Sequence, residues 1–313
     1  MAEMVKKATR ESFGETVTAL AAEYPEIVVL DADLAAATKT GIFKKAYPER
    51  FFDCGIAECN MVGVAAGLAT CGKIPFAASF AMFSAGRAFE QVRNSVGYPK
   101  LNVKIVGSHA GISVGEDGAT HQCCEDIALM RTIPGMVILN PCDHYEMQAA
   151  VHAAVEHKGP CYIRLGRLAV ESINNDDYKF ELGKGITLRE GTDITVVATG
   201  LMVQEAVKAA DALKEEGISV EVINIHTIKP LDEELVIASA KKTGRVITVE
   251  EHNIIGGLGE AVSTALSEHC PTPVTRIGVN DVYGHSGPAV DLLKEFGLSA
   301  EHIAEVIREK LAK

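Results

Sequence analysis

The stretch Asp53-Cys54-Gly55-Ile56-Ala57-Glu58-Cys59-Asn60-Met61 lies where two local patterns meet. Before it, the apolar run Tyr47–Phe52, interrupted at Arg50, predicts a strand. After it, the small and apolar residues of Met61–Ala69 predict a helix that packs closely against another backbone. Glu58 therefore opens a helix in poorly solvated surroundings. Burial disfavours the charged form of a carboxyl, so such a group can share a proton with the ring nitrogen of a ligand. The structural alternative is an acidic residue that the helix dipole favours at a helix N-terminus.

The rest of the chain alternates strand-like and helix-like segments, which is typical of a mostly parallel sheet covered by helices. A helical period of apolar residues runs from Ala8 to Ala22, and the polar run Glu171–Tyr178 indicates a linker. We therefore expect two α/β domains, each a mostly parallel sheet flanked by helices, at residues 1–170 and 190–313, with a linker at 171–189. The expected strands are Ile27–Leu30, Ile74–Ala78, Val103–Val106, Met136–Leu139, Cys161–Arg164, Ile194–Ala198, Val220–Asn224 and Arg245–Val249.

Composition narrows the class of protein. The 313 residues suit about two domains, and a hydrophobic content of 47% is enough for buried cores. A net charge of −12 argues against nucleic acid or an anionic membrane surface as the main partner. We find neither a membrane-spanning apolar run nor a signal peptide, and the eight cysteines form no Cys-x-x-Cys pair. A reduced, cytoplasmic location is the expectation.

Two stretches suggest other chemistry and do not support it well. His121-Gln122-Cys123-Cys124 has metal-ligand residue types, but contiguous residues do not easily surround one tetrahedral zinc ion. Gly256-Gly257-Leu258-Gly259 is glycine-rich but lacks the Gly-x-Gly-x-x-Gly pattern of dinucleotide-binding folds, and it does not open the first strand–helix–strand unit. We expect a tight turn there, leading into a helix from Glu260.

Several segments together resemble the transketolase family. Ile56-Ala57-Glu58-x-Asn60-Met61 is similar to the segment that carries the cofactor-activating glutamate of transketolases. Four further segments occur in the order and spacing of that family. They are Ser79–Phe83, Arg87–Arg93, Gly107–Gly118 and Thr227–Asp232. The resemblance covers nearly the whole chain and implies a pyrimidine-binding domain followed by a transketolase C-terminal domain.

The resembling segments correspond only to the C-terminal half of a full-length transketolase. Thiamine diphosphate enzymes hold the diphosphate and its metal with a Gly-Asp-Gly motif followed by an asparagine, and the nearest stretch here, Gly115-Glu116-Asp117-Gly118, has the wrong spacing. The resemblance thus implies no metal ligands on this chain. It implies an N-terminal transketolase subunit that supplies the diphosphate site and its Mg²⁺ or Ca²⁺, in a heterotetramer.

The resemblance also implies roles for residues around the cofactor, thiamine diphosphate. Glu58 is the candidate for the carboxyl that bonds the aminopyrimidine ring nitrogen and so activates the cofactor. Phe80 and Phe83 are candidates for the apolar platform under that ring, with Phe83 the stronger; ordinary core packing is the alternative. Where many relatives carry a further aromatic residue, this chain has Gly86.

Substrate recognition is implied for a second group of residues. His109 and His121 resemble residues that bond the ketose oxygens and assist proton transfer, and Asp117 resembles the carboxylate that reads the adjacent hydroxyl. Arg10 and Arg167 are candidates for the sugar phosphate, because a guanidinium binds phosphate oxygens in a bidentate fork. For Arg164 we expect a surface ion pair instead.

One position departs from the family. Where relatives carry a phosphate-binding serine after the first strand, this chain has Ala37, and we expect that either Thr38 or Thr40 replaces it or the acceptor depends less on its phosphate.

The function implied is ketol transfer between sugar phosphates in the pentose phosphate pathway. The alternatives are the beta subunit of a 2-oxo acid dehydrogenase, a deoxyxylulose phosphate synthase-like enzyme and a non-catalytic scaffolding subunit. For the C-terminal domain we expect subunit contacts rather than catalysis. Its polar residues His252, His285 and Ser286 are expected in loops without a chemical role.

Overall fold

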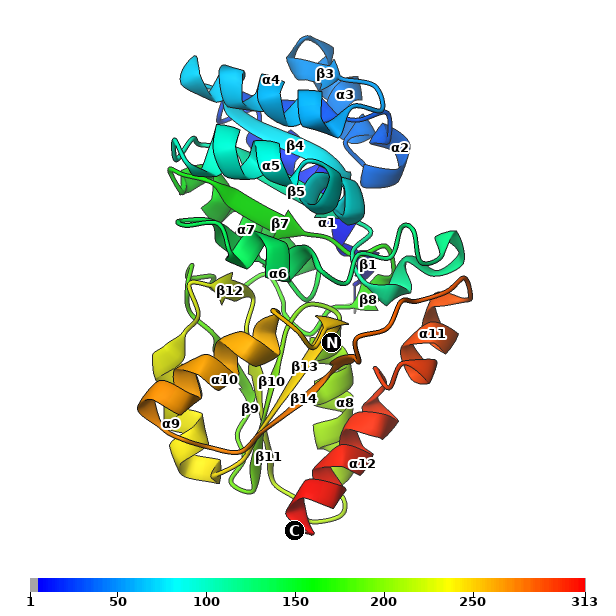
Figure 1. The fold of residues 1–313 in the computed structure, drawn as a ribbon, viewed down its shortest axis with the longest axis vertical. Coiled ribbons are helices and arrows are strands. Elements are labelled where there is room, and N and C mark those ends of the chain that lie inside the picture. Colours follow the sequence, from blue (N-terminus) through cyan, green and yellow to red (C-terminus); the bar gives the residue numbers. More distant parts are fainter. Residues whose placement is uncertain (1–4, 313) are drawn as a thin grey trace.

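The computed structural model describes residues 5–312, which form two α/β units stacked along the long axis of the molecule (Figure 1). The strands of the first sheet lie in the order β12 (Thr227–Lys229), β6 (Val137–Leu139), β7 (Cys161–Arg164), β5 (Lys104–Ser108), β4 (Ile74–Phe80), β2 (Ile27–Asp31) and β3 (Phe51–Asp53). Those of the second lie in the order β14 (Val274–Val279), β13 (Val246–Asn253), β10 (Ile194–Ala198), β11 (Val220–Asn224) and β9 (Ile186–Arg189). Only the edge strands β12 and β9 pair antiparallel within these sheets, so the predicted fold class is confirmed.

Helices cover both sheets. Around the first sheet they are α1 (Thr9–Leu20), α2 (Ala35–Thr38), α3 (Gly41–Ala46), α4 (Glu58–Thr70), α5 (Phe89–Gln91), α6 (Asp126–Arg131) and α7 (His144–Glu156). Around the second they are α8 (Met202–Lys214), α9 (Glu233–Thr243), α10 (Leu258–His269), α11 (Ala289–Glu295) and α12 (Ala300–Leu311). A short ribbon of β1 (Lys6–Ala8) and β8 (Ala169–Glu171) lies between the two units (Figure 1).

The predicted strands were found because parallel strands under two helical layers read as continuous apolar runs. Every residue of β2, β5, β7 and β10 is buried. The strand predicted over Tyr47–Phe52 was wrong in its extent. Pro48 begins a 3-10 turn that lasts to Arg50, because proline fixes φ and has no N–H to give to a sheet, and only Phe51–Asp53 pair with β2.

The two units exchange structure at their junction. Strand β12, which follows β11 in the chain, leaves the second unit and pairs with β6 of the first sheet. Strand β9 lies within residues 171–189 and joins the second sheet beside β11. Neither excursion shows as a pattern in the sequence, because both strands are short edge strands.

The surface ion pair expected for Arg164 was wrong, because the ion pair is buried. The side chain of Arg164 is buried at the junction and its Nε donates to Oδ2 of the fully buried Asp126 at 2.8 Å. His252 is a second correction, because it is buried near the end of β13 rather than placed in a loop. His285 and Ser286 do lie in a loop, as predicted.

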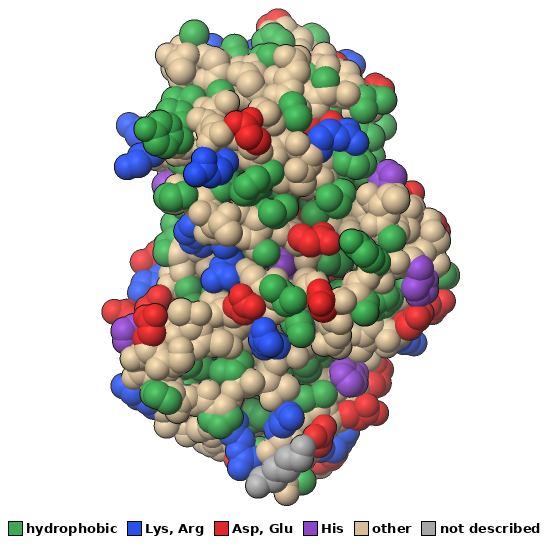
Figure 2. Space-filling model, in the orientation of Figure 1, with side chains coloured by type: hydrophobic (Ala, Val, Ile, Leu, Met, Phe, Trp, Pro, Cys, Tyr) green, Lys and Arg blue, Asp and Glu red, His purple; other side chains and the backbone are tan. Residues whose placement is uncertain are grey.

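No helix within residues 5–312 is both long enough and apolar enough to cross a membrane. Figure 2 shows acidic and basic side chains interspersed over one face of the molecule, so the net charge of −12 is not gathered there into a single block. The eight cysteines are free thiols.

Candidate active site

Glu58 is the first residue of α4, and its side chain is only 1% exposed. Its Oε1 accepts a hydrogen bond from the Ser79 hydroxyl at 3.1 Å, and its Oε2 accepts one from Nη1 of Arg87 at 2.7 Å. The guanidinium of Arg87 is half exposed, so a buried carboxylate is joined to a cation that reaches solvent. Both partners lie in stretches that resemble the family, but sequence reasoning gave them no role.

Arg87 reaches Glu58 because the chain after β4 winds as a π-helical turn, Met82–Arg87, in which Ala88 donates to the carbonyl of Phe83. Such turns occur frequently at functional sites. Gly86, the departure from the family pattern, lies inside this turn. The guanidinium of Arg87 lies 4.5 Å from the centroid of the Phe83 ring. The turn thus presents an aromatic face beside the buried carboxylate.

Four rings from two chain segments, Phe80–Phe83 and His109–His121, form one continuous surface. Phe80 and Phe83 are nearly parallel, with centroids 6.1 Å apart. The imidazole of His109 stacks on Phe80 at 4.0 Å, and that of His121 meets the Phe83 ring edge-on at 5.4 Å. The structure therefore brings both predicted aromatics and both predicted histidines together. Phe80 is 7% exposed and Phe83 is more open, which is the order expected if Phe83 meets a ligand.

His109 is held in one protonation state by its neighbours. Its Nε2 lies 3.3 Å from Nη1 of Arg10, which can only donate, and its Nδ1 lies 2.8 Å from the Ser108 hydroxyl. Nε2 is therefore the acceptor and the proton is on Nδ1. Burial first, and then the positive charges of Arg10 and Arg167, lower the pKa of His109 to about 3. With a φ of +57°, the residue also holds a left-handed backbone that is costly for a residue with a side chain.

The two predicted phosphate-binding arginines lie close enough to repel each other. Burial lowers the pKa of Arg10, and the charge of Arg167 lowers it further. Nη1 of Arg10 donates to the carbonyl of Ala37 at 2.8 Å. Arg167 donates to the carbonyl of Val114 and lies 3.9 Å from the carboxylate of Asp117. The site thus holds two positive charges with two carboxylates at their rim, those of Glu116, 2.9 Å from Arg167, and of the predicted substrate residue Asp117.

The threonines expected to replace the phosphate-binding serine do not reach this space. The hydroxyls of Thr38 and Thr40 both donate to Oδ2 of Asp31 at 2.8 Å, and all three residues are buried. Asp31 ends β2, so the pair is bound to the sheet rather than turned outward. The expected replacement by Thr38 or Thr40 was wrong, because the sequence does not show that a buried carboxylate takes both hydroxyls. The other expectation, an acceptor that depends less on its phosphate, stays a prediction.

The residues present fit the pyrimidine half of thiamine diphosphate. A ring needs one carboxyl at its edge and one flat apolar surface at its face. Glu58 and Phe83 provide these, and both contact the guanidinium of Arg87. Within residues 5–312 no group of three or more histidine, cysteine, aspartate or glutamate side chains is arranged to hold a metal ion.

Comparison with known proteins agrees with this geometry. Residues 5–172 match the family model "Transketolase, pyrimidine binding domain", and residues 183–303 match "Transketolase, C-terminal domain". The chain belongs to the transketolase family. It is 52% identical to a protein of Methanocaldococcus jannaschii named as a transketolase C-terminal section, over 99% of this chain and 98% of that protein. It is 46% identical to a 6-deoxy-6-sulfo-D-fructose transketolase subunit of Clostridium sp., over 96% and 93% of the two chains.

A solved transketolase structure has the same fold. The structure described as "Split gene transketolase, inactive beta4 tetramer" superposes with a TM-score of 0.91 at 52% identity, covering 98% of this chain and 99% of that one. The family assignment therefore rests on agreement across both units.

Proposed function

We propose that this chain is the C-terminal subunit of a split thiamine diphosphate-dependent transketolase. It would transfer a two-carbon ketol unit from a ketose phosphate to an aldose phosphate, as in the pentose phosphate pathway, in the cytoplasm. One observation carries the proposal: the buried carboxylate of Glu58 lies beside the aromatic and histidine rings on one surface. A scaffolding subunit would have no need of that arrangement.

Glu58 would bond the aminopyrimidine ring nitrogen, and Phe83 would support the face of the ring. When bound, thiamine diphosphate supplies an electron sink for carbonyl chemistry. Ser79 orients one carboxylate oxygen of Glu58 and Arg87 the other, so the side chain is fixed before the ring arrives.

The histidines and arginines would act on the sugar. His109 is neutral with its proton on Nδ1, and its Nε2, which accepts from Arg10 in this structure, would accept from a substrate hydroxyl once the Arg10 guanidinium turns to the substrate anion. His121 is partly exposed and lies across the rings from it, as suits a group that moves a proton at the ketose oxygen. Asp117 would accept a hydrogen bond from the neighbouring substrate hydroxyl. Arg10 and Arg167 would bind the terminal anion, whose charge relieves the repulsion between them.

A partner subunit would complete each site. We propose that an N-terminal transketolase subunit holds the diphosphate and its Mg²⁺ or Ca²⁺, in a heterotetramer with this chain. The solved relative supports this, because a tetramer of its single subunit is described as inactive. So does the Clostridium relative, which is named as a subunit.

A sulfonated ketose is a second candidate substrate. Ala37 has no hydroxyl, and Thr38 and Thr40 are turned inward, so anion recognition falls to the two guanidiniums. A guanidinium binds a sulfonate with the same fork of donors as a phosphate. The name of the Clostridium relative, a 6-deoxy-6-sulfo-D-fructose transketolase subunit, makes this alternative concrete.

The test is ketol transfer by the native complex pulled down on this chain. It is supplied with thiamine diphosphate, Mg²⁺, xylulose 5-phosphate and ribose 5-phosphate, and then with 6-deoxy-6-sulfo-D-fructose as the donor. Sedoheptulose 7-phosphate from the first pair supports the proposal. Activity with pyruvate alone would move the chain to the dehydrogenase or deoxyxylulose phosphate synthase class.

Glu58→Gln then separates catalysis from helix stability. We expect at least about a 100-fold loss of transfer, because general acid–base contributions are of this size. Glu260→Gln is the matched control, since Glu260 also lies in the first turn of a helix, α10, but far from the rings in the chain. Equal activity in the two variants would show that Glu58 only stabilises its helix.

A further inference from the structure

The segment His109–His121, which carries three of the proposed substrate residues, is covered by the second unit. Helix α11 packs against its 3-10 portion, Ile112–Asp117, as Figure 1 shows at the right of the molecule. The side chain of Gln122 donates to the carbonyl of His285 at 3.0 Å. Asn253, at the end of β13, donates its backbone N–H to the carbonyl of Cys124 at 2.8 Å. The geometry of this segment therefore depends on a neighbour that is distant in sequence.

Glu251 makes the most buried of these contacts. Its side chain is 4% exposed, and its Oε1 accepts a hydrogen bond from the backbone N–H of Ser113 at 2.6 Å. At Gly111, whose φ is +83°, a Cβ atom would overlap the Glu251 carboxylate. Glycine is therefore required there for two reasons, the left-handed backbone and the close approach of the carboxylate.

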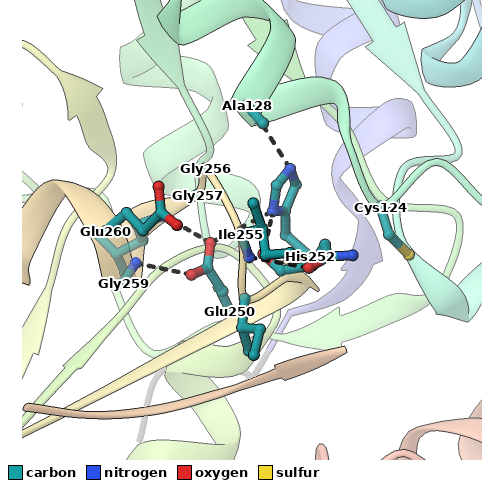
Figure 3. Close-up of polar contacts among 12 residues, drawn as sticks. Cys124, Ala128, Glu250, His252, Ile255, Gly256, Gly257, Gly259 and Glu260 are labelled. Atoms are coloured by element: carbon teal, nitrogen blue, oxygen red, sulfur yellow. Dashed lines mark hydrogen bonds and ion pairs between the residues drawn. The ribbon is translucent and has the colours of Figure 1, made fainter. Parts of the chain in front are cut away.

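Successive side chains of β13 point to opposite faces of the sheet, so Glu251 faces this segment and its two neighbours in the strand face away from it. Glu250 accepts hydrogen bonds from the backbone N–H groups of Leu258 and Gly259, at the start of α10. His252 accepts one from the N–H of Ala128 in α6 (Figure 3). Two adjacent buried glutamates thus serve different elements, and only Glu251 touches the segment that carries the substrate residues.

The segment also has backbone contacts within the first unit: Gly111 donates its N–H to the carbonyl of Cys123 at 2.8 Å, and the side chain of Arg167 donates to the carbonyl of Val114. The segment contains three glycines with positive φ, Gly111, Gly115 and Gly118, so its own conformational preferences are weak. Gly115 lies against the carbonyl of Gly287 and Gly118 against the side chain of Ser286, both from the second unit. Fixing such a backbone requires contacts from outside it.

We propose that Glu251 is a positioning residue, which holds the segment His109–His121 in its substrate-binding geometry by accepting the hydrogen bond of Ser113. The inference rests on the proposed function for its kinetic consequence. It assigns to the C-terminal domain a part in substrate binding beyond subunit contacts.

The kinetic test compares Glu251→Ala with Glu250→Ala in the reconstituted complex. We expect Glu251→Ala to lower kcat/KM for the ketose by roughly 10- to 100-fold, as small misplacements of substrate-positioning groups do, with unchanged thiamine diphosphate affinity. Glu251→Gln should restore most activity, because its amide oxygen can still accept from Ser113. Glu250→Ala should lower Tm and leave kcat/KM within about twofold, because its partners lie in α10. Equal kinetic losses in the two alanine variants, or none in Glu251→Ala, would overturn the proposal.

A second measurement does not need activity. Amide hydrogen exchange of the isolated chain should show faster exchange at residues 111–117 in Glu251→Ala than in Glu250→Ala. Gly111→Ala should give the same local change without removal of a charge, because its Cβ displaces the segment from the carboxylate. Unchanged protection in both variants would overturn the proposal even if the complex transferred ketol units. If the wild-type complex transfers none, the proposed function fails while this measurement still decides whether Glu251 holds the segment.

Discussion

Replacing Arg164 by methionine should destabilise the chain strongly, because it breaks a buried ion pair from one side. Arg164 donates from Nε to Asp126 Oδ2 at 2.8 Å and from Nη2 to Asp126 Oδ1 at 3.2 Å. Its Nη2 also donates to the backbone carbonyl of Glu251 at 2.8 Å, across the junction of the two units. Methionine keeps much of the length of the side chain and removes all of these donors.

The magnitude follows from what remains around Asp126. Its carboxylate is fully buried, and in the variant the Tyr162 hydroxyl, at 2.7 Å, is the remaining side-chain donor to it within residues 5–312. Removing one partner of a buried pair costs about 3–5 kcal/mol, since it leaves an uncompensated charge in the interior. With an unfolding entropy of roughly 2.1 cal/mol/K per residue, a chain of 313 residues should show a fall in Tm of roughly 5–8 °C.

The stability lost in Arg164→Met should depend on pH, because the protonation of Asp126 changes. Burial opposes the charge of Asp126, but the Arg164 guanidinium outweighs it and holds the pKa of that carboxyl below its ordinary value. In the wild type this contributes stability that is present above the ordinary pKa of aspartate and is lost only as pH falls through the lower, folded-state pKa. In Arg164→Met the buried carboxyl can take up a proton, so the loss of stability should shrink between about pH 7 and pH 5.

Urea unfolding followed by circular dichroism at both pH values measures this loss. The double variant Asp126→Asn, Arg164→Met is the control and should recover part of the stability at pH 7, because no buried charge is left unpaired. A loss below about 1 kcal/mol at pH 7, typical of exposed pairs, would refute the reasoning. So would a loss that does not change with pH.

Three further predictions concern the site and the junction. Arg87→Met should lower ketol transfer by about tenfold in steady-state assays, because the buried carboxylate of Glu58 loses its cation, and Arg87→Lys should restore part of it; full activity in the methionine variant would contradict this. The His109 imidazole should stay neutral with its proton on Nδ1 from about pH 5 to 9, and a ¹⁵N NMR midpoint above about pH 6 would be inconsistent with burial beside Arg10. Burial raises the pKa of Glu146 to about 7, so the stability it contributes is present below its ordinary pKa and is lost as pH rises through about 7; in Glu146→Gln urea unfolding should show a flatter profile over that window.

Much of the fold was accessible from the sequence because strand β2 and its neighbours are buried on both faces and so read as apolar runs. The errors arose where a local rule competed with that pattern. Pro48 converts half of an apolar run into a turn, and His252 looks like a loop residue because its strand, β13, ends in polar side chains. Those side chains are buried between two units, and a pattern of polarity does not reveal such an interface.

The site was accessible in part for a different reason. His109 and His121 lie in one segment, so their proximity follows from the chain itself. The pairing of Glu58 with Arg87 does not, because it depends on a π-helical turn that brings the guanidinium back over Phe83. Contacts of this kind depend on the tertiary structure. Residue types alone do not show which arginine pairs with a given glutamate.

The substrate segment His109–His121 is held by residues of both units. A segment that approaches a substrate closely benefits from glycine, and its three positive-φ glycines remove the side chains that would otherwise anchor it. Part of the anchoring then comes from the facing surface, where a carboxylate on a strand provides a strong acceptor for a single backbone N–H. Glu251 on β13 meets that requirement, and Arg164 ties the backbone of the same residue to Asp126 in the first unit. Stability of the junction and geometry of the substrate segment therefore both depend on Arg164 and Glu251, so variants of these two residues should change both together.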